Sequence, residues 1–155
     1  AGDIAPVDPL GRADAAKRLP MAHRRLDDVA ARLDVTPLRA IVDAAADFTP
    51  SHEVLCHGDL HVRHLLLDDR GELASVIDWG DACRGSRAID LLAVTALDAP
   101  QRETFAREYG EVDEPTWRFA RMLGVMLGAA LLAADPDGAS GVGGRRWLER
   151  LAANG

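Results

Sequence analysis

Cysteine and long apolar runs are scarce in this sequence of 155 residues. The two cysteines, Cys56 and Cys83, are too few for a disulfide framework and form no CxxC metal motif. A reducing compartment, the cytoplasm, is therefore the expected location. The longest apolar stretch, Met122–Ala134, is shorter than a membrane span, and residues 1–10 lack the basic start and apolar run of a signal peptide. We therefore expect no membrane partner.

Positive charge is also in deficit, with 25 Asp and Glu against 18 Lys and Arg. The net charge of −7 argues against non-specific binding of nucleic acid. The only lysine, Lys17, lies in the helix-prone segment AAKRLP. Low-complexity tracts are absent, and 48% apolar with 28% charged residues is the composition of an ordinary globular protein. The length predicts one domain over residues 1–155.

The hydrophobic pattern predicts a mainly helical α+β fold with a small central β-hairpin. Helical periodicity covers about residues 12–50 and 86–155, and residues 1–11 are an irregular start with two prolines and two glycines. The glycine-rich stretch at residues 138–146 is expected to be a flexible linker before the last helix. The expected helices are 20–34, a segment opening at Thr36, 88–97, 100–109, 114–134 and 144–153, and the expected strands are 54–56, 65–67 and 73–77.

The unusual polar residues gather around the β element, in the segment CHGDLHVRHLLLDDRGELASVIDWGDACRGSRAIDLL. A hairpin brings its two ends together, so Asp59, His64 and Asp78 are expected to converge at one edge. Phosphoryl transfer needs a carboxylate that accepts the proton of the attacking hydroxyl, and ligands that hold Mg²⁺ on the nucleotide phosphates. Two separated aspartates in this segment can supply these groups.

Two motifs, HGD at residues 57–59 and VIDW at residues 76–79, resemble the catalytic motifs of aminoglycoside and macrolide phosphotransferases. These enzymes are similar to choline-kinase-like enzymes and protein kinases. Asp90, in RAIDLL, fills a further aspartate position of the family, and the resemblance is specific over about residues 54–92. It implies the C-terminal lobe of a protein-kinase-like fold. It also implies ATP- and Mg²⁺-dependent transfer of the γ-phosphate to a hydroxyl of a small molecule such as an antibiotic.

The resemblance also implies roles for individual residues. Asp59 is the expected catalytic base and Asp78 the principal Mg²⁺ ligand. Asp90 and His57 are expected to support the catalytic loop. His64 replaces the usual asparagine of the family, as in macrolide phosphotransferases, and is expected to take part in catalysis, phosphate binding and the metal site. Imidazole is a poor ligand for Mg²⁺, so the second metal position depends on what His64 contacts.

Other residues near the motifs leave alternatives open. Arg63 is expected either to contribute charge at the phosphate or to lie solvated in the loop. Asp81 is expected either to assist metal binding or to serve in a turn. Trp79 is expected to pack in the core beneath the metal site. A second departure from the family is Gly-Ser-Arg at residues 85–87, where Gly-Asp-Pro is common.

The histidines permit a different function. His57, Asp59, His61 and His64 together are compatible with a zinc-dependent hydrolase, although that interpretation leaves Asp78 without a role. For His61 alone, an exposed loop position is favoured over a ligand role. A third interpretation is a non-catalytic pseudokinase or ligand-binding module. The acceptor molecule of a phosphotransferase is not readable from the sequence.

A complete kinase of this type has an N-terminal lobe with a five-stranded sheet, a phosphate-covering loop and a strand lysine. Roughly fifty helical residues precede the catalytic loop here, and Lys17 does not lie in an apolar strand. The sequence is therefore expected to lack the ATP-clamping lobe, as a fragment of a longer kinase, a truncated paralogue or one part of a two-chain enzyme. The face left uncovered is expected to cause homodimerisation or marginal solubility.

Overall fold

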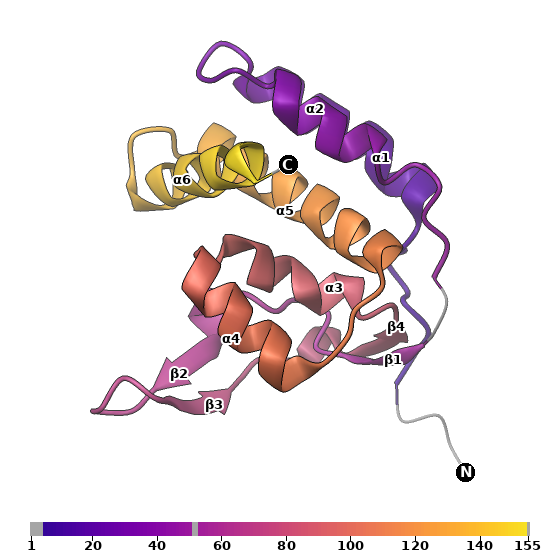
Figure 1. Cartoon of the computed structure of the whole chain (residues 1–155), viewed down its shortest axis with the longest axis vertical. Helices are drawn as coiled ribbons and strands as arrows, with labels where there is room; N and C mark the ends of the chain where they lie inside the picture. Colours follow the sequence, from indigo (N-terminus) through magenta and orange to yellow (C-terminus); the bar gives the residue numbers. More distant parts are fainter. Residues whose placement is uncertain (1–4, 51–52, 155) are drawn as a thin grey trace.

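The computed structural model describes residues 5–50 and 53–154 and confirms a mainly helical α+β fold (Figure 1). The helices are α1 (Ala15–Val29), α2 (Thr36–Asp43), α3 (Ala88–Leu91), α4 (Ala99–Tyr109), α5 (Glu114–Ala134) and α6 (Ala139–Ala153). The strands are β1 (Val54–Cys56), β2 (Leu65–Leu67), β3 (Leu73–Val76) and β4 (Cys83–Gly85). Three short 3-10 helices are η1 (Val62–His64), η2 (Trp79–Asp81) and η3 (Leu92–Ala96).

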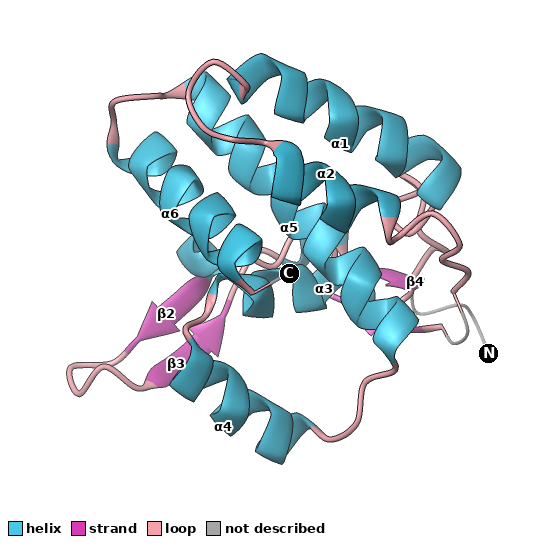
Figure 2. Cartoon of the chain, turned by 45° about the horizontal axis from the view of Figure 1, so that its top comes forward, coloured by secondary structure: helices cyan, strands magenta, loops and turns pink. Residues whose placement is uncertain are grey.

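Helix α5 is the centre of the helical part and contacts α1, α2, α3 and α6 (Figure 2). Its buried Phe119 stacks on Phe48, with ring centroids 4.1 Å apart. The apolar stretch seen in the sequence is only the second half of this helix. By length and composition α5 could cross a membrane, but half of the apolar window is buried inside the protein. That burial is the pattern of a central core helix.

Helix α1 begins earlier than the sequence predicted. The Asp14 carboxylate accepts a hydrogen bond from the Lys17 N–H at 3.2 Å and caps the helix, so Pro20 lies inside it and not at its start. The prediction of a helix over 20–34 was therefore displaced by about five residues. The helix buries Leu26 and Val29.

The predicted flexible linker at residues 138–146 was wrong, because α6 begins at Ala139. Gly144 in this segment and Gly128 in α5 allow the two helices to approach each other closely. A Cβ atom at Gly144 would lie 2.6 Å from the Gly128 carbonyl oxygen, and one at Gly128 would lie 3.1 Å from the Leu148 side chain. Glycine is therefore required by helix packing here and does not signal a loop.

The strands form two antiparallel ribbons. The predicted hairpin is β2–β3, with Leu65 opposite Val76 and an irregularity between Leu66 and Leu67. The second ribbon pairs β1 with β4, a strand that the sequence did not predict. The start of the chain lies along β4: the Arg84 N–H donates to the Pro6 carbonyl at 2.7 Å. Residues 6–8 are thus tied to the site, although the sequence pattern marked them as irregular.

A set of large apolar side chains is exposed on β1, on the β2–β3 hairpin and just after it. The hairpin projects from the body of the molecule (Figure 1). The exposed residues of these segments are Val54, Leu55, Leu66, Leu67, Leu73, Ile77 and Trp79. Leu67 and Leu73 face each other across the hairpin, and homodimerisation through this exposed apolar pair stays a prediction.

Candidate active site

The loop that follows β1 is held by one carboxylate from α3. The Asp90 side chain accepts hydrogen bonds from the His57 N–H at 2.7 Å and the Gly58 N–H at 3.0 Å. Consecutive N–H groups pointing at one carboxylate fix the path of the loop backbone. The structure thus places Asp90 where it can orient the residue that follows, Asp59.

His57 joins the same loop to the end of β3. Its ring is buried, and Nδ1 accepts a hydrogen bond from the Asp59 N–H at 3.3 Å. The neutral ring therefore carries its proton on Nε2 and donates it to the Ile77 carbonyl at 2.8 Å. Both ring nitrogens are used within the protein. This arrangement makes His57 a brace between the two motifs and leaves it no free nitrogen for a metal.

Two backbone conformations shape the site. Gly58 has φ 87°, and a Cβ atom there would lie 2.2 Å from the Asp81 carbonyl oxygen, so the loop passes too close to η2 for any side chain. Asp78 has φ 64° and is the one non-glycine residue with positive φ in the described part of the chain. A left-handed aspartate costs free energy and is common where a functional side chain must point in a set direction.

His64 connects the two predicted catalytic aspartates. Its Nδ1 donates to the carbonyl oxygen of Asp59 at 2.9 Å, and its Nε2 lies 3.4 Å from Oδ2 of Asp78. The Ile77 N–H also donates to the His64 carbonyl at 3.0 Å, which joins the ends of the hairpin. The hairpin therefore brings Asp59, His64 and Asp78 together, as the sequence predicted. Their chemical roles stay predictions.

His61 is the residue of this site that sequence reasoning set aside as a loop residue. Its ring lies against that of His64, with centroids 3.8 Å apart, and its Nε2 lies 3.7 Å from Oδ2 of Asp59. Burial lowers the pKa of His61, and the neighbouring His64 adds to the shift. The one sequence feature that pointed to a place in the site was the position of His61, two residues after Asp59. Of the four residues of the zinc interpretation, Asp59, His61 and His64 form one cluster, while His57 is committed to the loop.

Three further predictions concern residues at the edge of the site. Trp79 is half-exposed and its ring lies tilted against that of His57, with centroids 4.7 Å apart, so the prediction of a core position was wrong. Asp81 forms an ion pair with Arg12 at 2.9 Å, a partner that no sequence pattern indicated. The Arg63 side chain is exposed, and its guanidinium has no hydrogen bond or ion pair with any described residue.

At residues 85–87, where the sequence differs from the usual Gly-Asp-Pro of the family, Arg87 makes contacts with the segment before α5. Arg87 donates to the Glu111 carbonyl at 3.1 Å and lies 3.4 Å from Oδ2 of Asp113. Asp113 also caps α5, and hydrogen bonds from Thr116 lower the pKa of the Asp113 carboxyl. Arg87 therefore links the segment after β4 to the start of α5.

The donor set fits a magnesium site built on Asp78. Its carboxylate is 67% exposed and open to a ligand, and Mg²⁺ is commonly held by one or two carboxylates together with phosphate and water. The nitrogen of His64 is a donor that Mg²⁺ disfavours. His64 therefore suits a hydrogen bond to a metal-bound water better than direct coordination.

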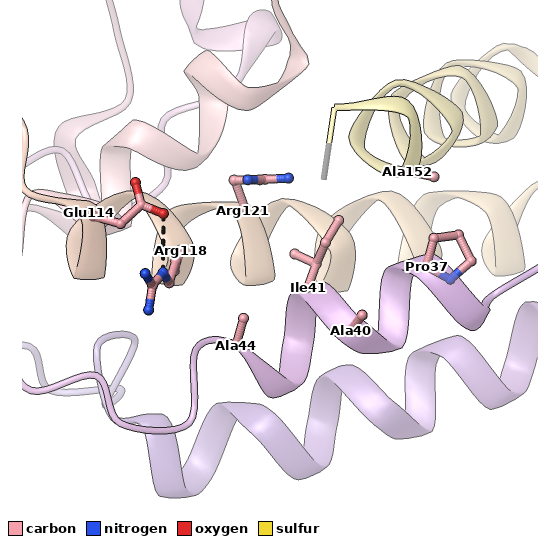
Figure 3. Close-up of a pocket in the computed structure, with 8 residues that line it drawn as sticks. All are labelled: Pro37, Ala40, Ile41, Ala44, Glu114, Arg118, Arg121 and Ala152. Atoms are coloured by element: carbon pink, nitrogen blue, oxygen red, sulfur yellow. Dashed lines mark hydrogen bonds and ion pairs between the residues drawn. The ribbon is translucent and has the colours of Figure 1, made fainter.

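An open cavity of about 350 Å³ lies elsewhere, between α2, α5 and the end of α6 (Figure 3). Its wall is mainly apolar, and Arg118 pairs with Glu114 at 3.1 Å across one end. None of the lining residues comes from the catalytic segment, so this cavity is separate from the Asp59 site. The lining residues are Pro37, Ala40, Ile41, Ala44, Glu114, Arg118, Arg121 and Ala152.

Comparison with known proteins places the chain in a family. The sequence model of the phosphotransferase enzyme family matches residues 3–123, which is more than half of the chain. No curated protein sequence matches it significantly. The GDP complex of aminoglycoside 2′-phosphotransferase-IIIa is 21% identical, with a TM-score of 0.60 over 97% of this chain and 54% of that protein. This TM-score supports the predicted kinase-like C-terminal lobe.

Two macrolide enzymes are also similar at low identity. Macrolide 2′-phosphotransferase type I is 22% identical, with a TM-score of 0.46 over 90% of this chain and 48% of that one. The apoenzyme of a macrolide 2′-phosphotransferase from Brachybacterium faecium is 23% identical, with a TM-score of 0.46 over 86% and 49%. The chain spans about half the length of these solved proteins. On the evidence of its sequence match and its fold, the chain belongs to the phosphotransferase enzyme family.

Proposed function

We propose that this chain supplies the catalytic lobe of a nucleoside-triphosphate-dependent O-phosphotransferase that acts on a hydroxyl group of a small molecule. The observation that carries the proposal is the joint position of Asp59 and Asp78 on either side of His64. A proton acceptor and a metal-binding carboxylate at one hairpin edge are two of the protein groups that phosphoryl transfer uses.

In the proposed reaction the acceptor hydroxyl oxygen forms a bond to the γ-phosphorus, and the bond from that phosphorus to the bridging oxygen breaks. The Asp59 carboxylate takes the hydroxyl proton, and the nucleoside diphosphate leaves. Mg²⁺, when bound by Asp78, neutralises charge on the phosphates. Asp90 and His57 hold the loop so that Asp59 keeps its position, since a displaced base loses much of its effect.

Binding of nucleotide can be tested on this chain directly. Titration calorimetry with Mg²⁺ and either ATP or GTP compares the unmodified chain with Asp78→Ala. Both nucleotides are needed because the similar aminoglycoside enzyme was solved with GDP. Asp69→Ala, a change of another exposed carboxylate in the hairpin turn, is the matched control. We expect weak binding that is lost in Asp78→Ala and kept in Asp69→Ala. Equal binding by all three proteins would argue against the Asp78 site.

Phosphoryl transfer is best tested with the full-length product of the gene. Aminoglycosides, macrolides and other hydroxyl compounds serve as acceptors. Asp59→Asn keeps the shape of the side chain but removes the proton acceptor. A general base contributes about 10²–10⁴-fold to rate, so we expect kcat to fall by roughly that factor. Retention of full kcat in Asp59→Asn would overturn the assignment of Asp59 as base.

A further inference from the structure

The proposed reaction leaves His61 without a role, although it lies at the centre of the site. One ligand atom from each of Asp59, His61 and His64 lies within 4.8 Å of the other two. The two imidazole rings are 3.8 Å apart, and His61 Nε2 is 3.7 Å from Oδ2 of Asp59. Ligand atoms around a tetrahedral zinc ion are about 3.3 Å apart. Small side-chain rotations would therefore bring the three ligand atoms to the distances that zinc requires.

The hydrogen bonds of His64 leave one nitrogen in the form that binds a metal. Because Nδ1 donates its proton to the Asp59 carbonyl, Nε2 of the neutral ring carries a lone pair. This is the usual arrangement of metal-binding histidines, whose second nitrogen donates to a backbone carbonyl or a carboxylate. The lone pair faces Oδ2 of Asp78 at 3.4 Å. Two electron-rich atoms at that distance repel each other unless a proton or a metal ion lies between them.

His61 needs one rearrangement to join this site. Its Nδ1 accepts a hydrogen bond from the Arg63 N–H at 3.3 Å, which places the ring proton on Nε2. Coordination through Nε2 moves that proton to Nδ1 and releases the Arg63 hydrogen bond. The bond is long and lies on an exposed loop, so its loss costs little.

We propose that Asp59, His61 and His64 bind a borderline transition-metal cation, represented by Zn²⁺, and that the bound ion blocks phosphoryl transfer by occupying the Asp59 carboxylate. Two imidazole nitrogens and one carboxylate oxygen are a donor set that zinc prefers and Mg²⁺ does not. Asp78 lies near enough to His64 to offer a fourth oxygen. The blocking effect rests on the proposed function, but the binding site does not.

Binding is tested on the metal-free chain by titration with Zn²⁺ in competition with a chromophoric chelator. The test variant is His61→Ala. The control is His23→Ala on α1, where the ring pairs with Asp43 at 3.0 Å, outside the catalytic segment. We expect one Zn²⁺ per chain and no displacement by excess Mg²⁺. Loss of an outer partner of a metal ligand costs about 10–100-fold in affinity, so loss of His61 itself should cost at least ten-fold.

Equal affinity of His61→Ala, His23→Ala and the unmodified chain would overturn the site, as would displacement of Zn²⁺ by Mg²⁺. Should His61→Ala fail to fold by circular dichroism, Co²⁺ replaces Zn²⁺ in the unmodified chain. Intense visible absorption from four-coordinate Co²⁺ is expected, and the weak spectrum of six-coordinate Co²⁺ would count against the proposal.

Inhibition is a separate measurement. In the phosphotransfer assay, Zn²⁺ near its dissociation constant should stop turnover, and a chelator should restore it. Zinc binding without inhibition would overturn the blocking effect and leave the site standing. Absence of any transfer activity would count against the proposed function, while the binding titration would still decide the metal site.

Discussion

At the scale of single residues, the site depends most on Asp90, which accepts two hydrogen bonds from the catalytic loop. No other side chain among the described residues accepts from the His57 or Gly58 N–H groups. Sequence reasoning placed Asp90 near the loop through a family resemblance. The two bonds show why an aspartate serves there, since its two oxygens reach two successive N–H groups.

Asp90→Ala is therefore expected to destabilise the protein. A hydrogen bond to a charged group contributes about 1.5–3 kcal/mol, and two are lost, although water replaces part of that energy at this half-buried position. We expect the free energy of unfolding in urea to fall by about 2–4 kcal/mol. Asp137→Ala, at an exposed turn position, should change it by less than about 0.5 kcal/mol. Equal effects of the two substitutions would contradict the role of Asp90.

The two cysteines give a prediction with a defined pH range. Burial raises the pKa of Cys56 to about 12 from its ordinary value of 9.0, and the nearby Asp90 adds to the shift. Above pH 9 the unfolded chain loses the thiol proton while the folded chain keeps it, so stability falls as pH rises toward 12. We expect Cys56→Ser to weaken this alkaline fall in urea unfolding, and the native thiols to react slowly with a thiol reagent at pH 8. Rapid reaction of both thiols would contradict their burial.

At the scale of secondary-structure elements, the contact of α5 with α6 decides the shape of the helical part. Two neighbouring glycines of α6 differ in their surroundings: Gly144 faces α5, and Gly143 faces open space. A methyl group meets the Gly128 carbonyl at the first position and nothing within 4 Å at the second. The same substitution should therefore have opposite effects one residue apart.

Gly144→Ala is expected to destabilise the protein by about 1–3 kcal/mol, because overpacking forces the two helices apart. Gly143→Ala should stabilise it by about 0.5–1 kcal/mol, since alanine loses less backbone entropy in a helix. Thermal and urea unfolding of both variants measures the contrast. A stabilising Gly144→Ala would show that α5 and α6 do not pack this closely.

At the scale of the whole molecule, the β2–β3 hairpin presents an exposed apolar face that is expected to drive association. Leu67 and Leu73 are partners across the hairpin and are 62% and 59% exposed. Adjacent apolar side chains on a protein surface commonly mark a site of association. The chain spans about half of the length of the solved aminoglycoside enzyme that it resembles.

We expect the chain to associate with itself through this face. In light scattering the double variant Leu67→Lys with Leu73→Glu should be monomeric at concentrations where the unmodified chain dimerises, because opposite charges replace the apolar pair at facing positions. Val142→Lys, an exposed change on α6, is the control and should not alter the association. A monomeric unmodified chain at high concentration would contradict the prediction.

The mainly helical α+β fold, the hairpin and the approach of Asp59, His64 and Asp78 could be predicted from the sequence, because they depend on local periodicity and on a turn of a few residues. Three other features could be seen only in the folded chain. Residues 6–8 pair with β4, Trp79 lies exposed against His57, and residues 139–146 are helical. Each results from contacts between segments far apart in the chain, which a local pattern does not contain. The histidine cluster could be predicted only in part. The spacing of His61 and His64 can be read from the sequence, but the short distance between their nitrogens is seen only in the structure.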